Sequence, residues 1–195
     1  MKGKDWYVIL APSMFSQSQL AETPAMDPRM LVGRTIESNL AELMGQPDKY
    51  YMNVKFRIEK VEGNKAYTRF DGYSCAREHL FRIVRRGSQK VRAVADVETT
   101  DGWKLQVISL FILNRNTDTE VKRKVRKLLF NEMVERAKQS SIDDFVLSVA
   151  GGILQREARK LGNKIYPIRF SEIESIEVKK AGQPDLSGPG GVAKE

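Results

Sequence analysis

The side chains that could carry out nucleophilic chemistry are few, because the 195-residue chain holds one cysteine, Cys75, and one histidine, His79. A cysteine nucleophile reacts as the thiolate, and a nearby imidazole can help to form it. The two residues are four apart, at the start of a helix predicted over 76–86, so contact between them is geometrically possible. We favour a simpler interpretation, in which Cys75 is a small buried thiol and His79 is a surface imidazole.

Metal and redox chemistry receives no support from these residue types. A single cysteine allows neither an intramolecular disulfide nor a Cys-based zinc site, and a lone histidine cannot build a multi-histidine site. The adjacent Asp143 and Asp144 could serve a metal-dependent nuclease, but Ser141 before them completes a helix-capping pattern that explains them better. Gly151-Gly152 lacks the spacing of a phosphate-binding glycine loop. We therefore expect no enzyme activity, no metal and no cofactor.

The charge of the chain favours a polyanionic partner. Thirty-three Lys and Arg against 25 Asp and Glu give a net charge of +8 and a pI of about 9.6, and each basic group that meets a phosphate releases a counterion. An acidic membrane surface is the rival interpretation. No apolar run approaches the roughly 20 residues that span a bilayer, and no apolar segment with a cleavage site opens the chain. We expect a cytoplasmic protein.

Positive charge is concentrated in two runs of sequence. The first, between Arg77 and Arg92, has six basic residues and one acidic residue, and the second, between Arg115 and Lys127, has six basic and two acidic. Either run alone could be a solvated face, but together they favour a polyanion site. The predicted phosphate contacts are Arg85, Arg86, Lys90, Arg92, Arg115, Lys122, Arg123, Lys124, Arg126 and Lys127, with Lys179 and Lys180 as weaker candidates.

A long hairpin lies between the two runs and must position them. Alternating apolar and polar residues over 91–98 predict a half-buried strand, and Gly102 can supply the positive φ of the tight turn that follows. The return strand, 103–113, ends in the unbroken apolar run 110–113, which predicts burial on both faces.

A basic helix follows the hairpin. Its apolar stripe contains Val121, Val125, Leu128 and Leu129, and basic residues occupy the opposite arc. Phe130 lies on the basic arc, where packing on a neighbour is favoured over stacking on a base. A further helix begins after Ser141, with Phe145, Val149 and Ile153 on its buried side and Gly151-Gly152 able to break it.

The remaining segments read as short elements of extended structure and one short helix. Before the first basic run, we expect an extended segment over 5–15, a connecting loop or flexible arm over 16–30, a strand over 31–38, a short helix over 40–44 capped by Ser38 or Asn39, and a hairpin of strands 50–61 and 65–73. The helix over 76–86 should turn Leu80, Phe81 and Val84 toward the core. After the basic helices we expect an extended segment over 165–170, a turn at 171–174 and an edge strand over 175–180.

These elements predict an α+β fold, in which a curved antiparallel sheet or partly closed β-barrel has helices packed at its side and extended terminal segments. Residues 1–180 are expected to form a single domain, because the length suits one sizeable core. From 181 to 195 the chain is rich in Gly and Pro and poor in apolar residues, which predicts a flexible tail.

Five short pieces of the chain, in order and at the right spacing, resemble one known family. They are Trp6-Tyr7 with Ala11-Pro12-Ser13-Met14-Phe15, then Gly33-Arg34, then Glu37-Ser38 with Leu40, then Val97-Glu98-Thr99-Thr100-Asp101-Gly102, and last Ile165-Tyr166-Pro167. The chain resembles the S-three-Ae (eS-one) family of small-subunit ribosomal proteins of archaea and eukaryotes, from Trp6 to about Lys180. It lacks the longer basic N-terminal arm and extended C-terminal region of eukaryotic members, and so is similar to the compact, archaeal form.

The resemblance implies a non-enzymatic, structural component of the small ribosomal subunit that supports translation. Such a protein would sit on the subunit platform near the mRNA exit, with rRNA near its 3′ region, neighbouring platform proteins and mRNA at the exit as partners. Two alternatives stay open at this point. One is a free-standing RNA-binding regulatory protein, which would use the same basic surface, and the other is an enzyme that acts on nucleic acid.

Overall fold

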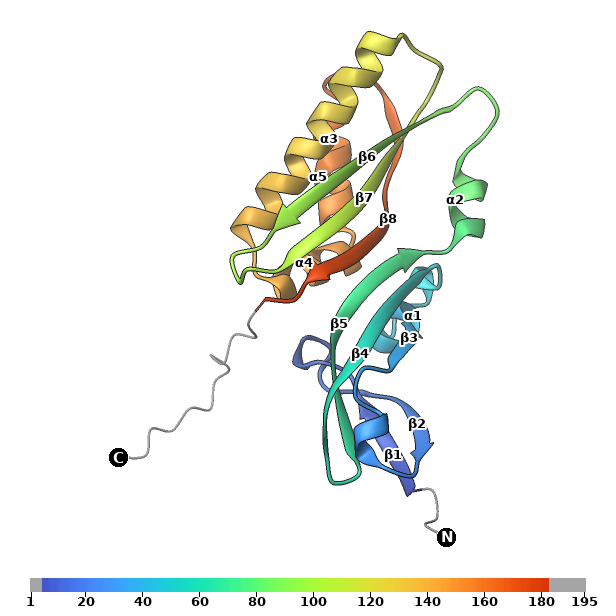
Figure 1. Ribbon diagram of the computed structural model, residues 1–195. Coiled ribbons are helices and arrows are strands. Elements are labelled where there is room, and N and C mark those ends of the chain that lie inside the picture. Colours follow the sequence, from blue (N-terminus) through green and yellow to red (C-terminus); the bar gives the residue numbers. More distant parts are fainter. Residues whose placement is uncertain (1–4, 183–195) are drawn as a thin grey trace.

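A computed structural model of the chain describes residues 5–182, in which eight strands form one open, mixed sheet and five α-helices pack beside it (Figure 1). The strands are β1 (Asp5–Leu10), β2 (Gln19–Ala25), β3 (Thr35–Asn39), β4 (Met52–Glu62), β5 (Lys65–Cys75), β6 (Gln89–Glu98), β7 (Lys104–Leu113) and β8 (Ile168–Lys180). The helices are α1 (Leu40–Met44), α2 (Arg77–Ile83), α3 (Thr119–Gln139), α4 (Ile142–Ala150) and α5 (Ile153–Gly162). The α+β class is confirmed, and the sheet does not close into a barrel.

The sheet runs in the order β2-β1-β5-β8-β7-β6, with β4 paired to β5 and β3 paired to β4. Its two halves meet where β5 lies against β8 over a short stretch, Gly72–Ser74 opposite Ser175–Glu177. A Cβ on Gly72 would lie 2.9 Å from the carbonyl oxygen of Ile176. The close approach of these two backbones therefore requires glycine at this position.

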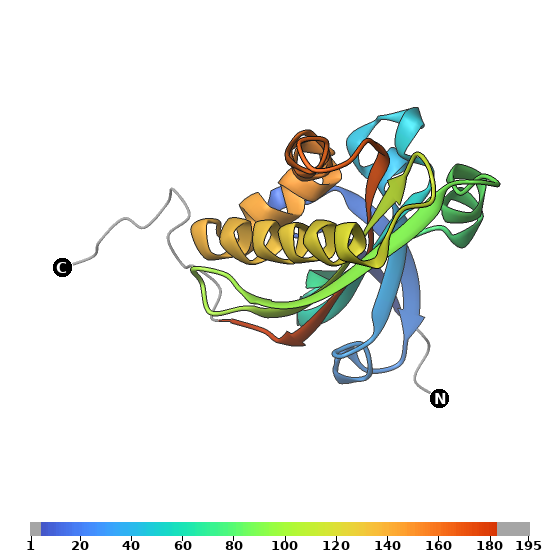
Figure 2. The same cartoon turned by 90° about the horizontal axis from the view of Figure 1, so that it is seen from above.

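Helices α3, α4 and α5 cover the half of the sheet that contains β6, β7 and β8, and α3 lies across the β6–β7 hairpin (Figure 2). Val125, Leu129, Met133 and Ala137 follow one another at four-residue spacing along α3, and all four are buried. That spacing places them on one face of the helix. The long helix is thus fixed to the hairpin by its apolar face and carries its charges on the other.

The predicted hairpin is confirmed in detail. The ladder of β6 and β7 runs without a break from Gln89 opposite Leu113 to Glu98 opposite Lys104. Gly102 has a φ of +75°, and its N–H donates to the carbonyl of Thr99 over 3.0 Å. The apolar run 110–113 is fully buried, because the helices cover one face of β7 and other core side chains cover the second.

Both helix caps predicted from sequence are confirmed. Asn39 precedes α1, and its side-chain oxygen accepts a hydrogen bond from the N–H of Ala41 over 2.8 Å. Ser141 precedes α4 and accepts from the N–H of Asp144 over 3.2 Å. Gly152, with a φ of +72°, separates α4 from α5, as the double glycine suggested.

The segment 16–30, predicted as a loop, contains the strand β2, so this prediction was wrong. β2 pairs antiparallel with β1, from Asp5 opposite Ala25 to Leu10 opposite Gln19. Its side chains show almost no apolar alternation, because β2 is an edge strand held by backbone hydrogen bonds, a position that also tolerates Pro24. β1 itself pairs in parallel with β5, so the sheet is mixed rather than purely antiparallel.

The turn predicted at 171–174 and the edge position predicted for 175–180 were also wrong. β8 is one continuous strand of 13 residues that lies between β5 and β7. The sequence shows no regular alternation here, because Ser171 and Glu172 are polar and the buried residues Ile168, Ile173 and Ile176 are unevenly spaced. A register shift between Ser175 and Ile173 accounts for that spacing.

Three predicted buried positions face solvent instead. Phe81 is 76% exposed and Val84 is exposed, because α2 ends at Ile83, which packs inward in their place. Ile153 is exposed as well, since Gly152 restarts the helix in a new phase. The strand predicted over 31–38 begins at Thr35. The single-domain organisation of residues 1–180 stays a prediction, and from residue 183 on the predicted tail lies outside the described residues.

Candidate nucleic-acid interface

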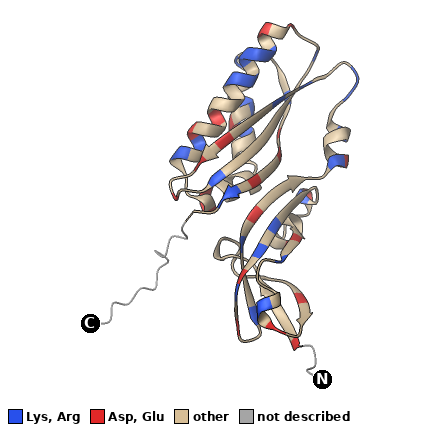
Figure 3. Cartoon of the chain, in the orientation of Figure 1, with Lys and Arg blue, Asp and Glu red and all other residues tan. Residues whose placement is uncertain are grey.

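The fold brings the two basic runs to one end of the molecule. The loop before β6 carries the end of the first run, and the loop after β7 carries the start of the second. These loops are adjacent because Gln89 pairs with Leu113, and the N–H of Thr117 donates to Gln89 Oε1 over 3.2 Å. In Figure 3, the Lys and Arg positions are blue along the adjoining part of α3 and in the loop before β6. We call this end, with its ten predicted residues, the basic end.

A tight turn presents the first run. Gly87 has a φ of +80°, Ser88 N–H donates to the carbonyl of Arg85, and Arg85 N–H donates to Ser88 Oγ, each bond spanning 3.0 Å. Arg85 and Arg86 are both exposed at this turn. Their backbone is therefore held in one shape, while their guanidinium groups face solvent.

The second run lies on the solvent face of α3 and in the loop before it. Arg115, Arg123, Lys124, Arg126 and Lys127 are exposed, whereas Lys122 is only partly exposed. The side chains remain on the surface because the opposite face of the helix is packed against the hairpin.

Phe130 also lies on this surface and is 41% exposed. It lines a shallow groove of about 280 Å³ together with Val94 of β6 and the basic side chains of Arg123, Arg126 and Lys127. The Nε of Arg126 donates to the carbonyl of Arg92 over 3.0 Å, which fixes the helix to the edge strand beside the groove. An aromatic face bordered by cations is the kind of surface on which an unpaired base can stack.

Three of the ten predicted side chains form ion pairs within the protein. Glu174 of β8 lies 3.0 Å from Arg92 and 3.5 Å from Lys90, and Glu120 lies 2.7 Å from Lys124. Within residues 5–182 the other members of the basic end form no ion pair. They are Arg85, Arg86, Arg115, Lys122, Arg123, Arg126 and Lys127. The weaker candidates Lys179 and Lys180 lie at the opposite end of β8, where Lys179 pairs with Glu177 over 3.0 Å.

Cys75 and His79 do not form a nucleophile and base. Burial, with smaller contributions from Glu172 and Glu174, raises the pKa of Cys75 to about 12, so the thiol stays protonated at neutral pH. The imidazole of His79 is partly buried and stacks on Tyr51, with ring centroids 3.7 Å apart, and burial lowers its pKa. The buried thiol is confirmed, and the surface imidazole was wrong.

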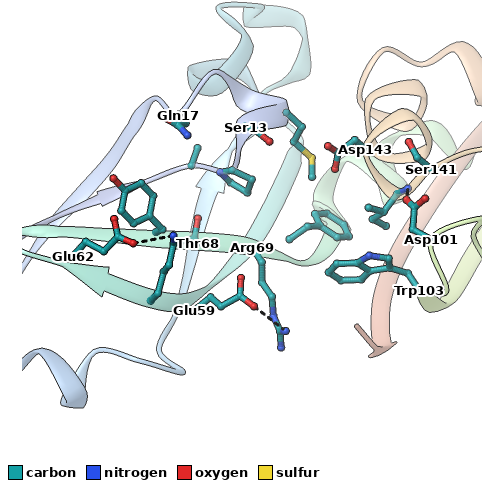
Figure 4. Close-up of a pocket in the computed structure, with 17 residues that line it drawn as sticks. Ser13, Gln17, Glu59, Glu62, Thr68, Arg69, Asp101, Trp103, Ser141 and Asp143 are labelled. Atoms are coloured by element: carbon teal, nitrogen blue, oxygen red, sulfur yellow. Dashed lines mark hydrogen bonds and ion pairs between the residues drawn. The ribbon is translucent and has the colours of Figure 1, made fainter. Parts of the chain in front are cut away.

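A pocket of about 450 Å³ lies between the segment 11–17, the β4–β5 hairpin and the start of α4 (Figure 4). Its charged groups are engaged with one another or with the backbone. Lys60 pairs with Glu62 over 2.9 Å, and Asp101 accepts from the N–H of Ile142 over 2.8 Å. Among residues 5–182, no three His, Cys, Asp or Glu side chains could hold a metal ion. The pocket thus presents neither an activated nucleophile nor a metal-ligand set.

A further group of cations was missed by sequence reasoning. Lys49, Arg156 and Arg159 line one pocket, although they come from segments more than 100 residues apart. Arg156, Arg159 and Lys160 recur at three- and four-residue spacing on α5, and this periodicity was the available signal. No sequence pattern indicated that Lys49 lies near these α5 residues, because its position depends on how the segment before β4 packs beside α5.

Comparison with known proteins agrees with the sequence resemblance. The model of the Ribosomal S3Ae family matches residues 1–182. The chain belongs to this family. The S3Ae match covers every one of the five motif pieces, so the resemblance is confirmed.

Several archaeal members of the S3Ae family are similar to the chain over most of their length. The small ribosomal subunit protein eS1 of Methanopyrus kandleri is 39% identical, over 91% of this chain and 86% of that protein. The protein of the same name from Sulfurisphaera tokodaii is 34% identical, over 92% of this chain and 93% of that protein. The protein of the same name from Saccharolobus islandicus is 36% identical, over 92% of this chain and 86% of that protein. The archaeal source of these relatives agrees with the predicted archaeal type.

Proposed function

We propose that this chain is a structural constituent of the small ribosomal subunit and that it binds rRNA through the basic end. Membership of the S3Ae family and relatives named as small ribosomal subunit proteins support the structural role. The observation that carries the RNA-binding part is the joining of two basic runs, separated by the hairpin in sequence, at one end of the molecule.

The chemistry of the basic end suits rRNA. Phosphate contacts fix the position of a protein on a nucleic acid, and folded RNA is recognised largely by its shape. The unpaired cations Arg85 and Arg86 project from a fixed turn, and Arg123 and Lys127 project from a packed helix. This arrangement offers cations at defined positions, which matches a folded polyanion better than a flexible one.

The family resemblance supports a proposed location within the particle. The protein would sit on the platform near the mRNA exit, contact rRNA near its 3′ region and neighbouring platform proteins, and lie close to mRNA at the exit. It would work in the cytoplasm, as part of the ribosome and without catalytic activity. Within residues 5–182, no helix combines the length and apolar character needed to cross a bilayer.

Binding to small-subunit rRNA, compared with a scrambled RNA over a series of salt concentrations, tests this function. A steep loss of affinity with salt, together with a preference for rRNA, is the expected result. Equal binding to both RNAs would contradict a dedicated rRNA site. Co-sedimentation with small subunits in high-salt sucrose separates a permanent constituent from a free-standing RNA-binding regulator, because only the constituent stays in the particle.

Charge reversal at Arg123 and Lys127 tests the basic end itself. The double substitution Arg123→Glu/Lys127→Glu should weaken rRNA binding roughly ten- to a hundredfold near physiological salt and reduce the salt slope by about two. Lys65→Glu/Lys138→Glu is the matched control, with the same change in net charge at exposed positions away from the basic end. Equal losses in both variants would show a general charge effect and contradict the assigned site.

A further inference from the structure

A second pocket, of about 350 Å³, lies beside the junction of α4 and α5. Four segments line it: the turn at Asp48–Lys49, the start of β4, the double glycine with α5, and β8 near Glu172. Its volume falls within the range of about 300–1,000 Å³ usual for small-ligand sites. The side chains that line it divide into a floor of hydrogen-bond acceptors and a rim of cations.

The floor contains a buried acceptor without a donor. Gln155 is 6% exposed, and its Nε2 donates to the carbonyl of Val149 over 3.1 Å. Since a carbonyl can only accept, the amide orientation is fixed, and Oε1 is the atom left over. That oxygen is buried and has no hydrogen-bond partner among the described residues. Buried polar atoms are nearly always paired, so this oxygen keeps the capacity to accept one more hydrogen bond.

Glu172 is the second acceptor in this pocket. It is partly buried, and within residues 5–182 its carboxyl group forms neither a hydrogen bond nor an ion pair. The aromatic rings of Tyr51 and Phe170 line the same space. One face of the Tyr51 ring is already stacked on His79, which holds the ring in place.

The rim is cationic and held in position. Arg156 Nε donates to the carbonyl of Gly152 over 3.2 Å, and Arg159 Nε donates to the carbonyl of Ile168 over 3.1 Å, which leaves the outer nitrogens of both guanidinium groups available. Lys49 lies near Arg156, and burial together with that neighbouring charge lowers its pKa. In the described part of the chain, none of these three cations has an ion-pair partner.

The first turn of α5 adds partial positive charge to the same rim. The ten-residue helix begins at Ile153, its N-cap residue Gly152 offers no side-chain cap, and its first turn has no acidic residue. Its first N–H groups therefore have no partner within the helix and carry the positive end of the helix dipole. An anionic group is the chemistry that such an end attracts.

We propose that this pocket binds one unpaired nucleotide of RNA, whose base donates an amino group to Gln155 Oε1 while its phosphate lies against Arg156, Arg159 and Lys49. The inference rests on the proposed function, since it names a second contact for the same partner. Unpaired nucleotides in RNA are commonly recognised by hydrogen bonds to the base edge and by aromatic contacts. In this pose Gln155 Oε1 accepts from the exocyclic amino group of adenine or cytosine, whereas hypoxanthine and uracil place a carbonyl oxygen at the same position.

Nucleotide titrations of the full chain, followed by NMR of the Gln155 side-chain amide and the α5 backbone amides, test the base preference. AMP and CMP should shift these signals at concentrations at least about fivefold lower than IMP and UMP do. Equal shifts with inorganic phosphate alone would reduce the site to an anion site and overturn the proposal. Shifts with an acidic peptide but with no nucleotide would assign the rim to a protein partner and overturn it as well.

Variants on α5 test the rim with a matched pair. Arg156→Ala should weaken binding of a single-stranded RNA of mixed sequence about tenfold, whereas Lys160→Ala, one turn away and outside the pocket, should not. Lys49→Ala repeats the test from another segment. If both rim variants bind like Lys160→Ala while Arg123→Glu/Lys127→Glu loses rRNA, the pocket is refuted and the proposed function stands. If the latter variant also binds rRNA normally, the proposed function itself fails.

Discussion

The carboxyl group of Glu172 gives a quantitative prediction about stability. Burial raises its pKa from 4.5 to about 7. One pKa unit corresponds to about 1.4 kcal/mol, so holding this group ionised in the folded protein costs up to roughly 3 kcal/mol. Glu172→Gln keeps the shape of the side chain and removes the ionisation, and should therefore stabilise the protein at alkaline pH.

The sign follows from proton binding by the two states. Below about pH 4.5 the carboxyl is protonated in both the folded and the unfolded chain, and it has no effect. Between 4.5 and about 7 the unfolded chain ionises first, so the free energy of unfolding falls as pH rises. Above about pH 7 the carboxyl is ionised in both states, and the free energy of unfolding falls no further on its account. Of the groups around it, Tyr51 and Cys75 both have a pKa raised to about 12, so neither ionises between pH 5 and 8.5.

Urea unfolding of wild type and variant at pH 5 and pH 8.5 measures the effect. The variant should exceed the wild type by about 2–3 kcal/mol at pH 8.5 and by less than about 1 kcal/mol at pH 5. Glu177→Gln, on the same strand but exposed, serves as control and should change stability by less than about 0.5 kcal/mol at either pH. If Glu172→Gln raised the free energy of unfolding equally at pH 5 and pH 8.5, the buried, ionised carboxylate would be refuted as the cause.

Two glycines give further predictions. Gly102→Val should lower the free energy of unfolding in urea by at least about 1–2 kcal/mol, because the turn holds φ at +75°. Gly102→Asn should cost clearly less, because Asn tolerates positive φ. Equal losses in the two variants would show that φ is not the cause. Gly162→Ala would bring a methyl group into overlap with Ile168 Cδ1 and should cost roughly 1–3 kcal/mol. Since Ile168→Val removes that atom, the double substitution should be less destabilising than the sum of the two, and strict additivity would contradict the overlap.

How far the fold followed from sequence depended on whether burial alternated along each element. β6 alternates buried and exposed residues throughout, so its bounds and its turn were predictable. β2 has one buried residue, Ala25, and pairs through its backbone, which leaves no pattern in its side chains. The bulge at Glu174 breaks the alternation of β8, and for this reason one strand was read as two segments and a turn.

The site was predictable where it is local in sequence and not where it is assembled by packing. Each basic run is a sequence feature, and the hairpin between them indicated that they would meet. The α5 pocket joins Lys49, Gln155 and Glu172, whose partners in space are far away along the chain. A buried amide oxygen without a donor is visible only once the coordinates define which atoms surround it.

The ion pairs of Glu174 change how the charge of the basic end should be interpreted. Counting residues gives Lys90 and Arg92 the same weight as Arg85 and Arg86, yet the first two hold a carboxylate of the central strand β8 and the last two hold none within the described residues. Because Glu174 lies at a bulge, its side chain reaches past β7 to the edge strand, and the pair ties β6 to β8. An RNA phosphate near Lys90 or Arg92 must compete with this carboxylate, whereas one near the 85–88 turn or the exposed face of α3 meets unpaired cations. The affinity for RNA should therefore be concentrated in the turn and the helix, and the edge strand between them acts mainly to fix the distance from one to the other.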